Sequence, residues 1–173
     1  EDLQTGAYNR LMSQVVSCCR NLPSGKEMDS RLLDFGMSGF EDMFERIEGL
    51  RAGSMKAREF PKNLKKILVL SRVTIGADVA ITSVLMQRLL GRFPRAEIVL
   101  IGDEKLKELF GSNPDIRIAP VKYSRRGGLI ERFASWHSVL EIVRDEKSDC
   151  GDDDYVVVDP DSRLSQLGVL PLI

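Results

Sequence analysis

The sequence has few of the residues on which metal, disulfide and membrane proteins depend. Its 173 residues include one histidine and three cysteines. Cys18 and Cys19 are adjacent and Cys150 is distant, which gives neither a metal-ligand spacing nor an even disulfide framework, so we expect reduced thiols. No apolar run approaches the roughly 18 residues that a membrane span needs, and no signal-peptide pattern opens the sequence. These absences predict a cytoplasmic protein without a metal.

Charge of one sign is also lacking, because the formal net charge is -1. A balance this close to neutral gives no whole-protein attraction for a polyanion, so we expect no nucleic-acid partner. Local basic clusters at residues 62–66 and at Arg125 and Arg126 could still meet a phosphate group.

Glycine-rich phosphate loops are missing as well. A dinucleotide site needs Gly-x-Gly-x-x-Gly after the first strand, and this chain has only Gly76 there. A P-loop needs a lysine after its last glycine, and Gly127-Gly128 is not followed by one. The sequence therefore argues against NAD and P-loop enzymes and predicts no bound cofactor.

What is present is a strand, a turn, a helix and a second strand between residues 65 and 102. Residues 65–71 form a continuous apolar run behind two lysines, which is typical of a strand buried on both faces of a parallel sheet. A helical stripe of apolar residues runs from Val79 to Leu90, and strand composition returns at residues 97–101. This pattern is one βαβ unit.

The same alternation continues towards the end of the chain. It predicts a short helix at residues 104–110, a strand at 116–121, a long helix at about 128–145 and a strand at 155–159. We therefore expect an α/β fold with a Rossmann-like, doubly wound parallel sheet over residues 64–173.

Residues 1–60 have a different pattern and predict an all-helical N-terminal extension. Apolar residues recur there at helical intervals, with breaks at residues 23–25 and 36–39. We expect these apolar residues to pack on the α/β domain: Leu3, Tyr8, Leu11, Val15, Val16, Leu32, Leu33, Phe40, Phe44, Ile47 and Leu50. The extension shows no chemistry of its own, because its acidic residues fit a solvated helix face.

The apolar segment at residues 167–173 has two interpretations. Either further protein covers it, so that the chain is a fragment, or it packs back on the core. We favour the first.

Candidate site residues gather where the first strand ends and the next helix begins. In open α/β sheets, ligands bind outside the carboxyl ends of the strands. That region holds Ser71, Arg72, Thr74, Gly76 and Asp78, in front of a helix N-terminus with free amide donors. From the residues alone, Asp78 fits better as an aspartate that caps the helix or complements its dipole.

Other candidates follow the third and fourth strands. Arg125 and Arg126 could bind an acceptor phosphate or carboxylate, because guanidinium groups bind such anions bidentately, although they also fit a plain surface loop. Asp159 ends the fourth strand and either faces the ligand side of the sheet or helps to cap the next helix. His137 fits a half-buried or surface position within a helix better than a catalytic one.

Several motifs together carry a family resemblance. They are residues 67–85 with their Ser, Gly and Asp positions, residues 88–94 ending in Phe-Pro, the strand at 96–102, Asn-Pro-Asp-Ile at 113–116, and Val-Val-Asp with the arginine-serine turn at 157–165. In order and spacing this resembles the opening half of the ADP-heptose:lipopolysaccharide heptosyltransferases, glycosyltransferase family nine.

The resemblance implies a GT-B fold, in which this half binds the acceptor and a following Rossmann-like domain binds the nucleotide-sugar. It implies inverting, metal-independent transfer of a heptose-like sugar to a saccharide or lipid-linked acceptor, as in lipopolysaccharide biosynthesis, with association of the enzyme with the inner face of the membrane. Asp78 matches the family's aspartate, the general base that an inverting transfer needs. Ala77 separates Gly76 from Asp78, which the family has adjacent, and one extra residue turns a helix by about 100° unless the turn absorbs it.

Two other functions stay open. The chain could be a non-catalytic binding or assembly module that keeps the Rossmann-like core, or a small-molecule-binding α/β domain unrelated to sugar transfer. On the transferase interpretation, residues 1–173 alone lack the donor site and should not catalyse.

Overall fold

A four-stranded parallel sheet forms the centre of this structure, a computed structural model that describes residues 2–54, 61, 64–71, 76, 78–122, 128–160 and 168–173. The strands are β1 (Lys66–Leu70), β2 (Glu97–Gly102), β3 (Ile116–Pro120) and β4 (Tyr155–Val158). Their order is β3-β2-β1-β4 and every neighbouring pair is parallel. The chain moves outward from β1 to β3 and then crosses to the other side of β1. The predicted Rossmann-like, doubly wound sheet is confirmed.

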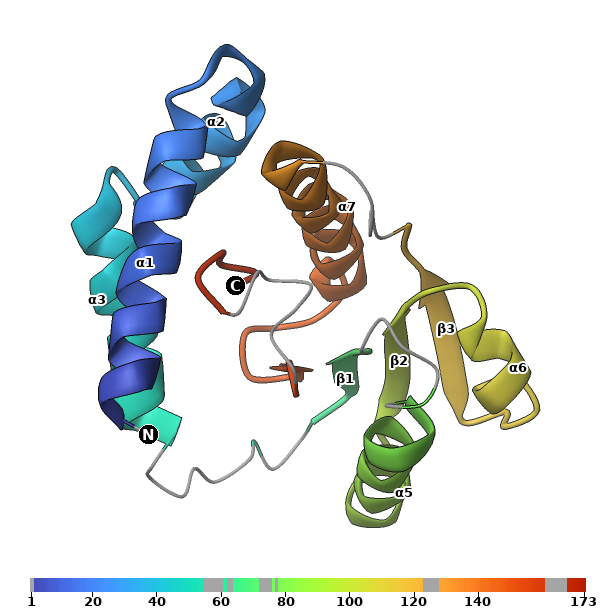
Figure 1. Cartoon of the computed structure of the whole chain (residues 1–173). Coiled ribbons are helices and arrows are strands. Elements are labelled where there is room, and N and C mark those ends of the chain that lie inside the picture. The colour runs from blue at the N-terminus through green and yellow to red at the C-terminus, as the bar shows by residue number, and fades with distance from the viewer. Residues whose placement is uncertain are drawn as a thin grey trace.

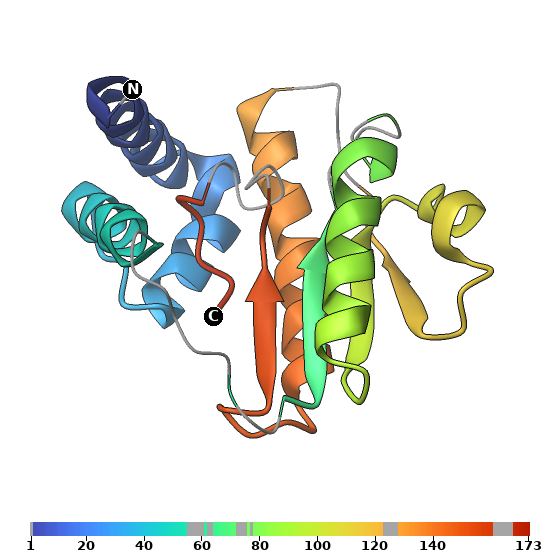
Figure 2. The same ribbon diagram turned by 90° about the horizontal axis from the view of Figure 1, so that it is seen from below.

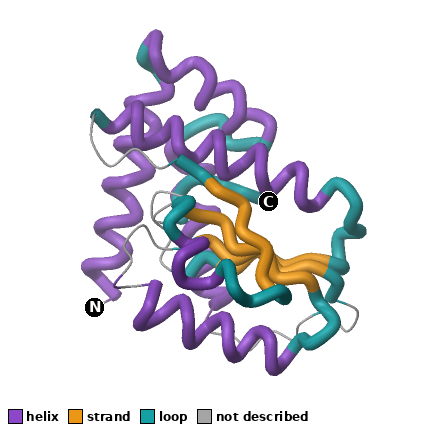
Figure 3. The backbone as a smooth tube through the Cα atoms, turned by 90° about the vertical axis from the view of Figure 1, so that its right-hand side faces the viewer, coloured by secondary structure: helices purple, strands orange, loops and turns teal. Residues whose placement is uncertain are grey.

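Both faces of the sheet are apolar because side chains alternate along each strand. On β1, Ile67 and Val69 face one side, while Leu68 and Leu70 face the other, and all four are buried. A continuous apolar run rather than an alternating one is what such a strand requires. Figure 3 shows the strands between helices above and below them.

The face with Ile67 and Val69 is covered by the elements that connect the first three strands. These are η2 (Asp78–Thr82), α5 (Ser83–Arg92) and α6 (Leu106–Phe110). Met86 and Leu89 of α5 point into this core, spaced by three residues as a helical face requires.

The opposite face is covered by α7 (Leu129–Lys147) and by the N-terminal helices. These helices are α1 (Asp2–Arg20), the short η1 (Pro23–Gly25), α2 (Lys26–Asp34) and α3 (Phe40–Ser54). In Figure 1, α1 and α3 stand beyond α7 and the C-terminal segment as seen from the sheet. Val16, Leu32 and Met43 belong to the same buried cluster as Leu68 and Leu70. The helical extension therefore contributes to the core of the sheet.

The prediction of which residues pack on the α/β domain is partly wrong. Val16 and Leu32 are buried, as predicted, but four others are exposed: Tyr8, Leu11, Leu33 and Leu50. For Tyr8 and Leu11, the two that belong to α1, the physical reason is that polar side chains occupy the buried side of this helix. Asn9 donates to Glu48 of α3 at 2.9 Å, and Arg20 donates to the carbonyl of Met37 at 2.8 Å.

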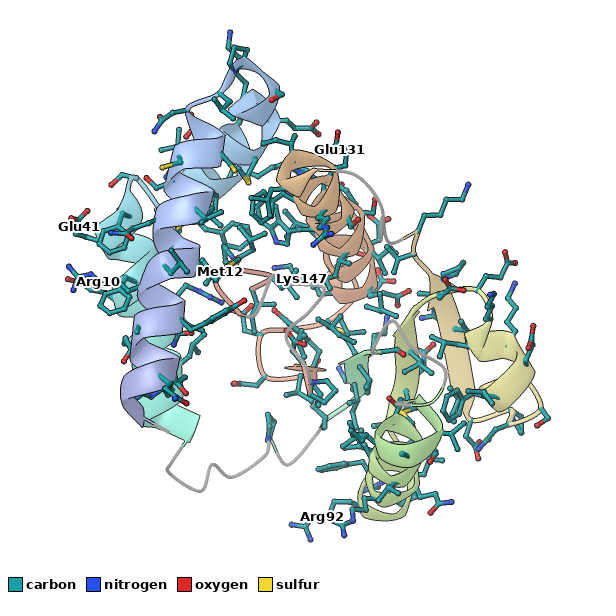
Figure 4. All side chains as sticks on the ribbon, in the orientation of Figure 1. Arg10, Met12, Glu41, Arg92, Glu131 and Lys147 are labelled. Carbon is teal, nitrogen blue, oxygen red and sulfur yellow. The ribbon has the colours of Figure 1, made fainter. Side chains whose placement is uncertain are left out.

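Arg10 lies on the side of α1 that faces Phe40 and Phe44 of α3. The sequence analysis expected these two rings to pack on the α/β domain. Phe40 and Phe44 stack on each other with ring centroids 5.8 Å apart, and the Arg10 guanidinium lies 5.7 and 5.6 Å from the two centroids. Figure 4 shows Arg10 on the α3 side of α1 and Met12 on the side towards α7. The rings are therefore covered by a cation rather than by the sheet.

The predicted break at residues 36–39 is confirmed in detail. Gly36 has a φ of 73°, and the N–H groups of Gly36 and Met37 donate to Leu33 and Leu32, which closes α2 with a Schellman motif. Asp42, in the first turn of α3, then accepts from the N–H groups of Ser38 and Gly39 at 2.7 and 3.0 Å. Hydrogen bonds from Ser38 and Gly39 lower the pKa of Asp42.

The C-terminal segment packs on the core, which is the interpretation that the sequence analysis did not favour. Val169, Leu170 and Leu172 are buried in the cluster that includes α7. The indole Nε1 of Trp136 donates to the Pro171 carbonyl at 2.7 Å within this core. The apolar character of the segment is thus explained by contacts within the chain.

An ion network joins the strands at their amino ends. Arg117 of β3 donates to both carboxylate oxygens of Glu146 at 2.7 and 2.5 Å, and to Glu97 at 2.7 Å. Lys66 of β1 donates to Glu146 at 3.1 Å. The hydrogen bonds from Arg117, and then that from Lys66, hold the pKa of Glu146 below its usual value, while Glu146 raises the pKa of Arg117.

Replacing Glu146 with glutamine removes its charge from the ion pairs with Arg117 and Lys66, so we expect the free energy of unfolding at pH 7 to fall by about 1–2 kcal/mol. The loss is no larger because Arg117 is nearly half exposed and solvent screens part of the attraction. A lowered native-state pKa stabilises the fold above the usual pKa of 4.5 and loses this effect as the pH falls through the native value. Urea unfolding of both proteins from pH 7 to pH 3 measures this. A constant difference over that range would contradict it, and Glu108→Gln on the exposed side of α6 is the control.

Replacing Trp136 with phenylalanine tests the anchoring of the C-terminal segment. The variant keeps an aromatic ring but leaves the buried Pro171 carbonyl without its donor, so we expect a loss of about 2 kcal/mol in unfolding free energy. Tyr8→Phe, at a half-exposed ring, is the control and should change stability by less than about 0.5 kcal/mol. Equal effects of the two substitutions in denaturant unfolding would refute this role of Trp136.

Candidate functional site

The strand order gives the sheet one switch point, between β1 and β4. The chain leaves β1 towards β2 on one side and returns to β4 on the other side of β1. In open α/β sheets, ligands bind outside the carboxyl ends of the strands at such a point. Figure 2 shows β1 (green) and β4 (red-orange) pointing to the edge where α5 and α7 begin. The candidate residues that follow β1, β3 and β4 in the sequence therefore belong to connections at a single edge.

Ser71 is held firmly at the end of β1. It is buried, and its N–H donates to the carbonyl of Ile101 in β2 at 2.8 Å. The approach is close because Gly102 has no side chain. A Cβ at Gly102 would lie 2.8 Å from Cβ of Ser71 and 2.6 Å from Cδ1 of Leu106. Ser71 thus forms part of a rigid floor at this edge.

Gly76 lies beyond Ser71 with open space around it. It is exposed, and a Cβ built on it would meet no atom within 4 Å. Packing therefore does not explain this glycine, and the space around it leaves room for another molecule to approach the backbone.

The backbone of Asp78 begins a short π-helix, η2, which passes directly into α5. A π-helical turn accommodates one more residue than an α-helical turn and is common at functional sites. Thr82, Met86 and Leu89 are buried in succession below it, so α5 keeps its face on the sheet. Ala77 and the Asp78 side chain lie outside the described residues.

Asp159 follows β4 on the other side of the switch point. Val69 pairs with Val158, so continuing this register by one residue sets Asp159 beside Leu70, just before Ser71. Asp159 is half-buried and already has an interaction within the chain. Of the predicted site residues, the structure brings Ser71 and Asp159 to neighbouring strand ends.

Four predicted site residues lie outside the described residues: Arg72, Thr74, Arg125 and Arg126. The segments beside the two arginines are described. Val121 donates its N–H to the carbonyl of Gly102 at 2.7 Å, and α7 begins after Gly128. Both flanking points lie at the carboxyl edge of the sheet.

Arg46 of α3 is a candidate that the sequence analysis missed. Its guanidinium is half-buried, burial lowers its pKa, and it donates to the Gly168 carbonyl at 3.1 Å beyond β4. No carboxylate pairs with Arg46 among the described residues. The sequence did contain a signal for this residue, because a cation stands between Met43 and Ile47 on the apolar face of α3.

His137 is half-buried, as predicted, and faces α2 rather than the strand ends. It lines a small cavity with Gly25 and Met28, and burial lowers its pKa. Throughout the described part of the chain, no group of three or more histidine, cysteine, aspartate or glutamate residues could hold a metal ion. None of the described helices is both long and apolar enough to cross a bilayer.

Comparison of the chain with protein-family models, with curated proteins and with solved structures finds no match. The resemblance to glycosyltransferase family nine therefore rests on the sequence motifs alone.

Replacing Gly102 with alanine tests the close approach at the end of β2. The added methyl group would overlap Ser71 and Leu106, so we expect a loss of about 1–3 kcal/mol in unfolding free energy. Gly91→Ala is the matched control, because Gly91 is exposed in α5 with no atom near its missing side chain. It should instead gain about 0.5–1 kcal/mol from helix propensity. Changes of the same sign in thermal unfolding would disprove the packing argument.

Proposed function

We propose that this chain is the acceptor-side part of an inverting, metal-independent glycosyltransferase with a GT-B fold. The supporting observation is that a parallel Rossmann-like sheet has its switch point beside β1, and that the backbone of Asp78 begins a π-helical turn just after it. The Ser, Gly and Asp motif that resembles family nine spans this same turn.

Asp78 is the proposed general base. Its carboxylate would take the proton from an acceptor hydroxyl as that oxygen attacks the anomeric carbon of the sugar. The bond from that carbon to the diphosphate oxygen breaks, and the nucleoside diphosphate leaves with the electron pair. Attack from the opposite side inverts the anomeric centre, and no metal ion is required for the proton transfer.

The other predicted residues would bind the acceptor around this base. Ser71, Thr74 and Gly76 would form the floor and backbone of the pocket, and Arg72 would lie beside them. Arg125, Arg126 and Asp159 would bind acceptor groups from the β3 and β4 sides, the arginines through phosphate or carboxylate oxygens. The donor, a nucleotide-sugar carrying a heptose-like sugar, would bind to a second Rossmann-like domain.

Exposed apolar side chains at the same edge support a lipid-linked acceptor. Val79 and Ile81, just after Asp78, are 53% and 43% exposed, and Leu129 at the start of α7 is 45% exposed. Apolar side chains at the mouth of a polar site suit an acceptor with both a sugar and an acyl chain. They also suit peripheral association with the inner face of a membrane.

A binding or assembly module is the second candidate. The exposed Tyr8 and Leu11 on one side of α1 favour it, because they offer an apolar surface away from the sheet. Such a module would bind no nucleotide-sugar.

Replacing Asp78 with asparagine in the protein together with its donor domain tests the proposal. Loss of the base should lower sugar transfer by about 10²- to 10⁴-fold, while donor binding stays unchanged because the donor occupies the other domain. Turnover of ADP-sugars and other nucleotide-sugars, with calorimetry for donor binding, measures both effects.

Asp103→Asn is the matched control, since Asp103 follows β2 at the same edge and its carboxylate accepts from the N–H of Lys105. It should transfer sugar normally. Full transfer by Asp78→Asn would remove Asp78 as the base, whereas failure of the unaltered protein to bind any nucleotide-sugar would favour the binding module.

A further inference from the structure

Apart from the small cavity beside His137, a larger cavity opens at the amino edge of the sheet. This edge is opposite the one that holds the candidate site. Its volume is about 520 Å³, which falls within the range of small-molecule sites. It is lined by the segment that enters β1, the turn between α5 and β2, and the residue before β4: Leu64, Lys65, Arg92, Phe93, Pro94, Arg95, Ala96 and Asp154.

Backbone hydrogen bonds tie these three segments together. The N–H of Glu97 donates to the carbonyl of Lys65 at 2.8 Å, and the N–H of Lys65 donates to the carbonyl of Asp154 at 2.7 Å. The N–H of Ala96 donates to the carbonyl of Phe93 at 3.1 Å and closes the turn. The walls are therefore built on paired strands and a closed turn, which is the rigid support that a binding site needs.

The cavity has an excess of positive charge. Lys65 pairs with Asp154 at 2.6 Å, and this pair is neutral. Arg92 and Arg95 are exposed, and neither has a carboxylate partner in the described part of the chain. Figure 4 shows Arg92 projecting from the far end of α5. Two guanidinium groups are thus left to bind an anion.

Helix stabilisation accounts for only one of these arginines. Arg92 lies in the last turn of α5, where a cation complements the helix dipole. Arg95 lies beyond the helix, in the turn before β2, so the dipole does not explain it.

The floor of the cavity is apolar. Leu64 is buried, Phe93 and Ala96 are half-buried, and Pro94 completes the surface. A ligand that fits both the floor and the arginines has an apolar body and an anionic end.

We propose that this cavity binds a phosphate monoester with an apolar body. Arg92 and Arg95 would hold the phosphate, because planar guanidinium groups bind phosphate oxygens through paired hydrogen bonds. Leu64 and Phe93 would contact the apolar body. The phosphate could come from a soluble ester or from a lipid headgroup, and the site does not depend on the proposed transferase activity at the other edge.

Titration of the intact chain with phenyl phosphate, followed by NMR of the backbone amides, tests the proposal. We expect saturable shifts of the amide signals of residues 64–65, 92–93 and 95–96, which line the cavity. Arg92→Gln/Arg95→Gln should weaken binding about tenfold or more, because each arginine supplies charge-assisted hydrogen bonds. Arg88→Gln, on the exposed side of α5 but outside the cavity, should bind as the unaltered chain does.

Removing the negative charge of Asp154 should have the opposite effect on phosphate binding. Asp154→Asn keeps an oxygen for the N–H of Gly151 but releases Lys65 from its ion pair. It should bind phenyl phosphate several-fold more tightly, and higher salt should weaken binding to every variant. Weaker or equal binding by Asp154→Asn would overturn the electrostatic basis of the site.

Sedimentation with phosphatidylcholine vesicles, with and without phosphatidic acid, distinguishes the two sources. If the protein sediments with the vesicles only when they contain phosphatidic acid and both arginines are present, the site is supported with a lipid headgroup as its ligand. Binding of phenyl phosphate alone would support it with a soluble ester. Saturable binding of neither probe, or equal binding by the double arginine variant, would refute the proposal.

Discussion

The structure depends on the need to cover a parallel sheet on both faces. The side chains of β1 alternate between two buried clusters, so neither face can remain in water. The connections α5 and α6 cover one face, while α7 shares the other with the N-terminal helices and the C-terminal segment. The helical extension therefore helps to cover this face of the sheet.

The same constraint produces the site at the carboxyl edge. Because β4 returns to the free side of β1, the carboxyl ends of these two strands lie side by side. Close packing of Ser71 against Gly102 fixes the floor, and the π-helical turn at η2 lets α5 keep its buried face above it.

The two edges of the sheet differ in how their charges are satisfied. At the amino edge, Arg117 and Lys66 are neutralised by Glu146 and Glu97, and this network links β1, β2, β3 and α7. Close by, on the α5 side, Arg92 and Arg95 have no carboxylate partner among the residues that the structure describes. Paired charges contribute to stability, whereas these two arginines, which lack a carboxylate partner in the described part of the chain, are the basis of the proposed phosphate site.

The sequence by itself determined the strands, most of the helix limits and the loops in which the site residues were sought. Buried parallel strands and amphipathic helices leave local periodic patterns, and breaks such as Gly36 reflect the conformation of a single residue. Only the tertiary structure decided the strand order, the burial of the C-terminal segment on Trp136, the network around Glu146 and the cavity beside Arg95. These depend on contacts between residues far apart in the chain, whose choice follows from which surfaces fit together and bury the most apolar area, and no local pattern encodes that choice.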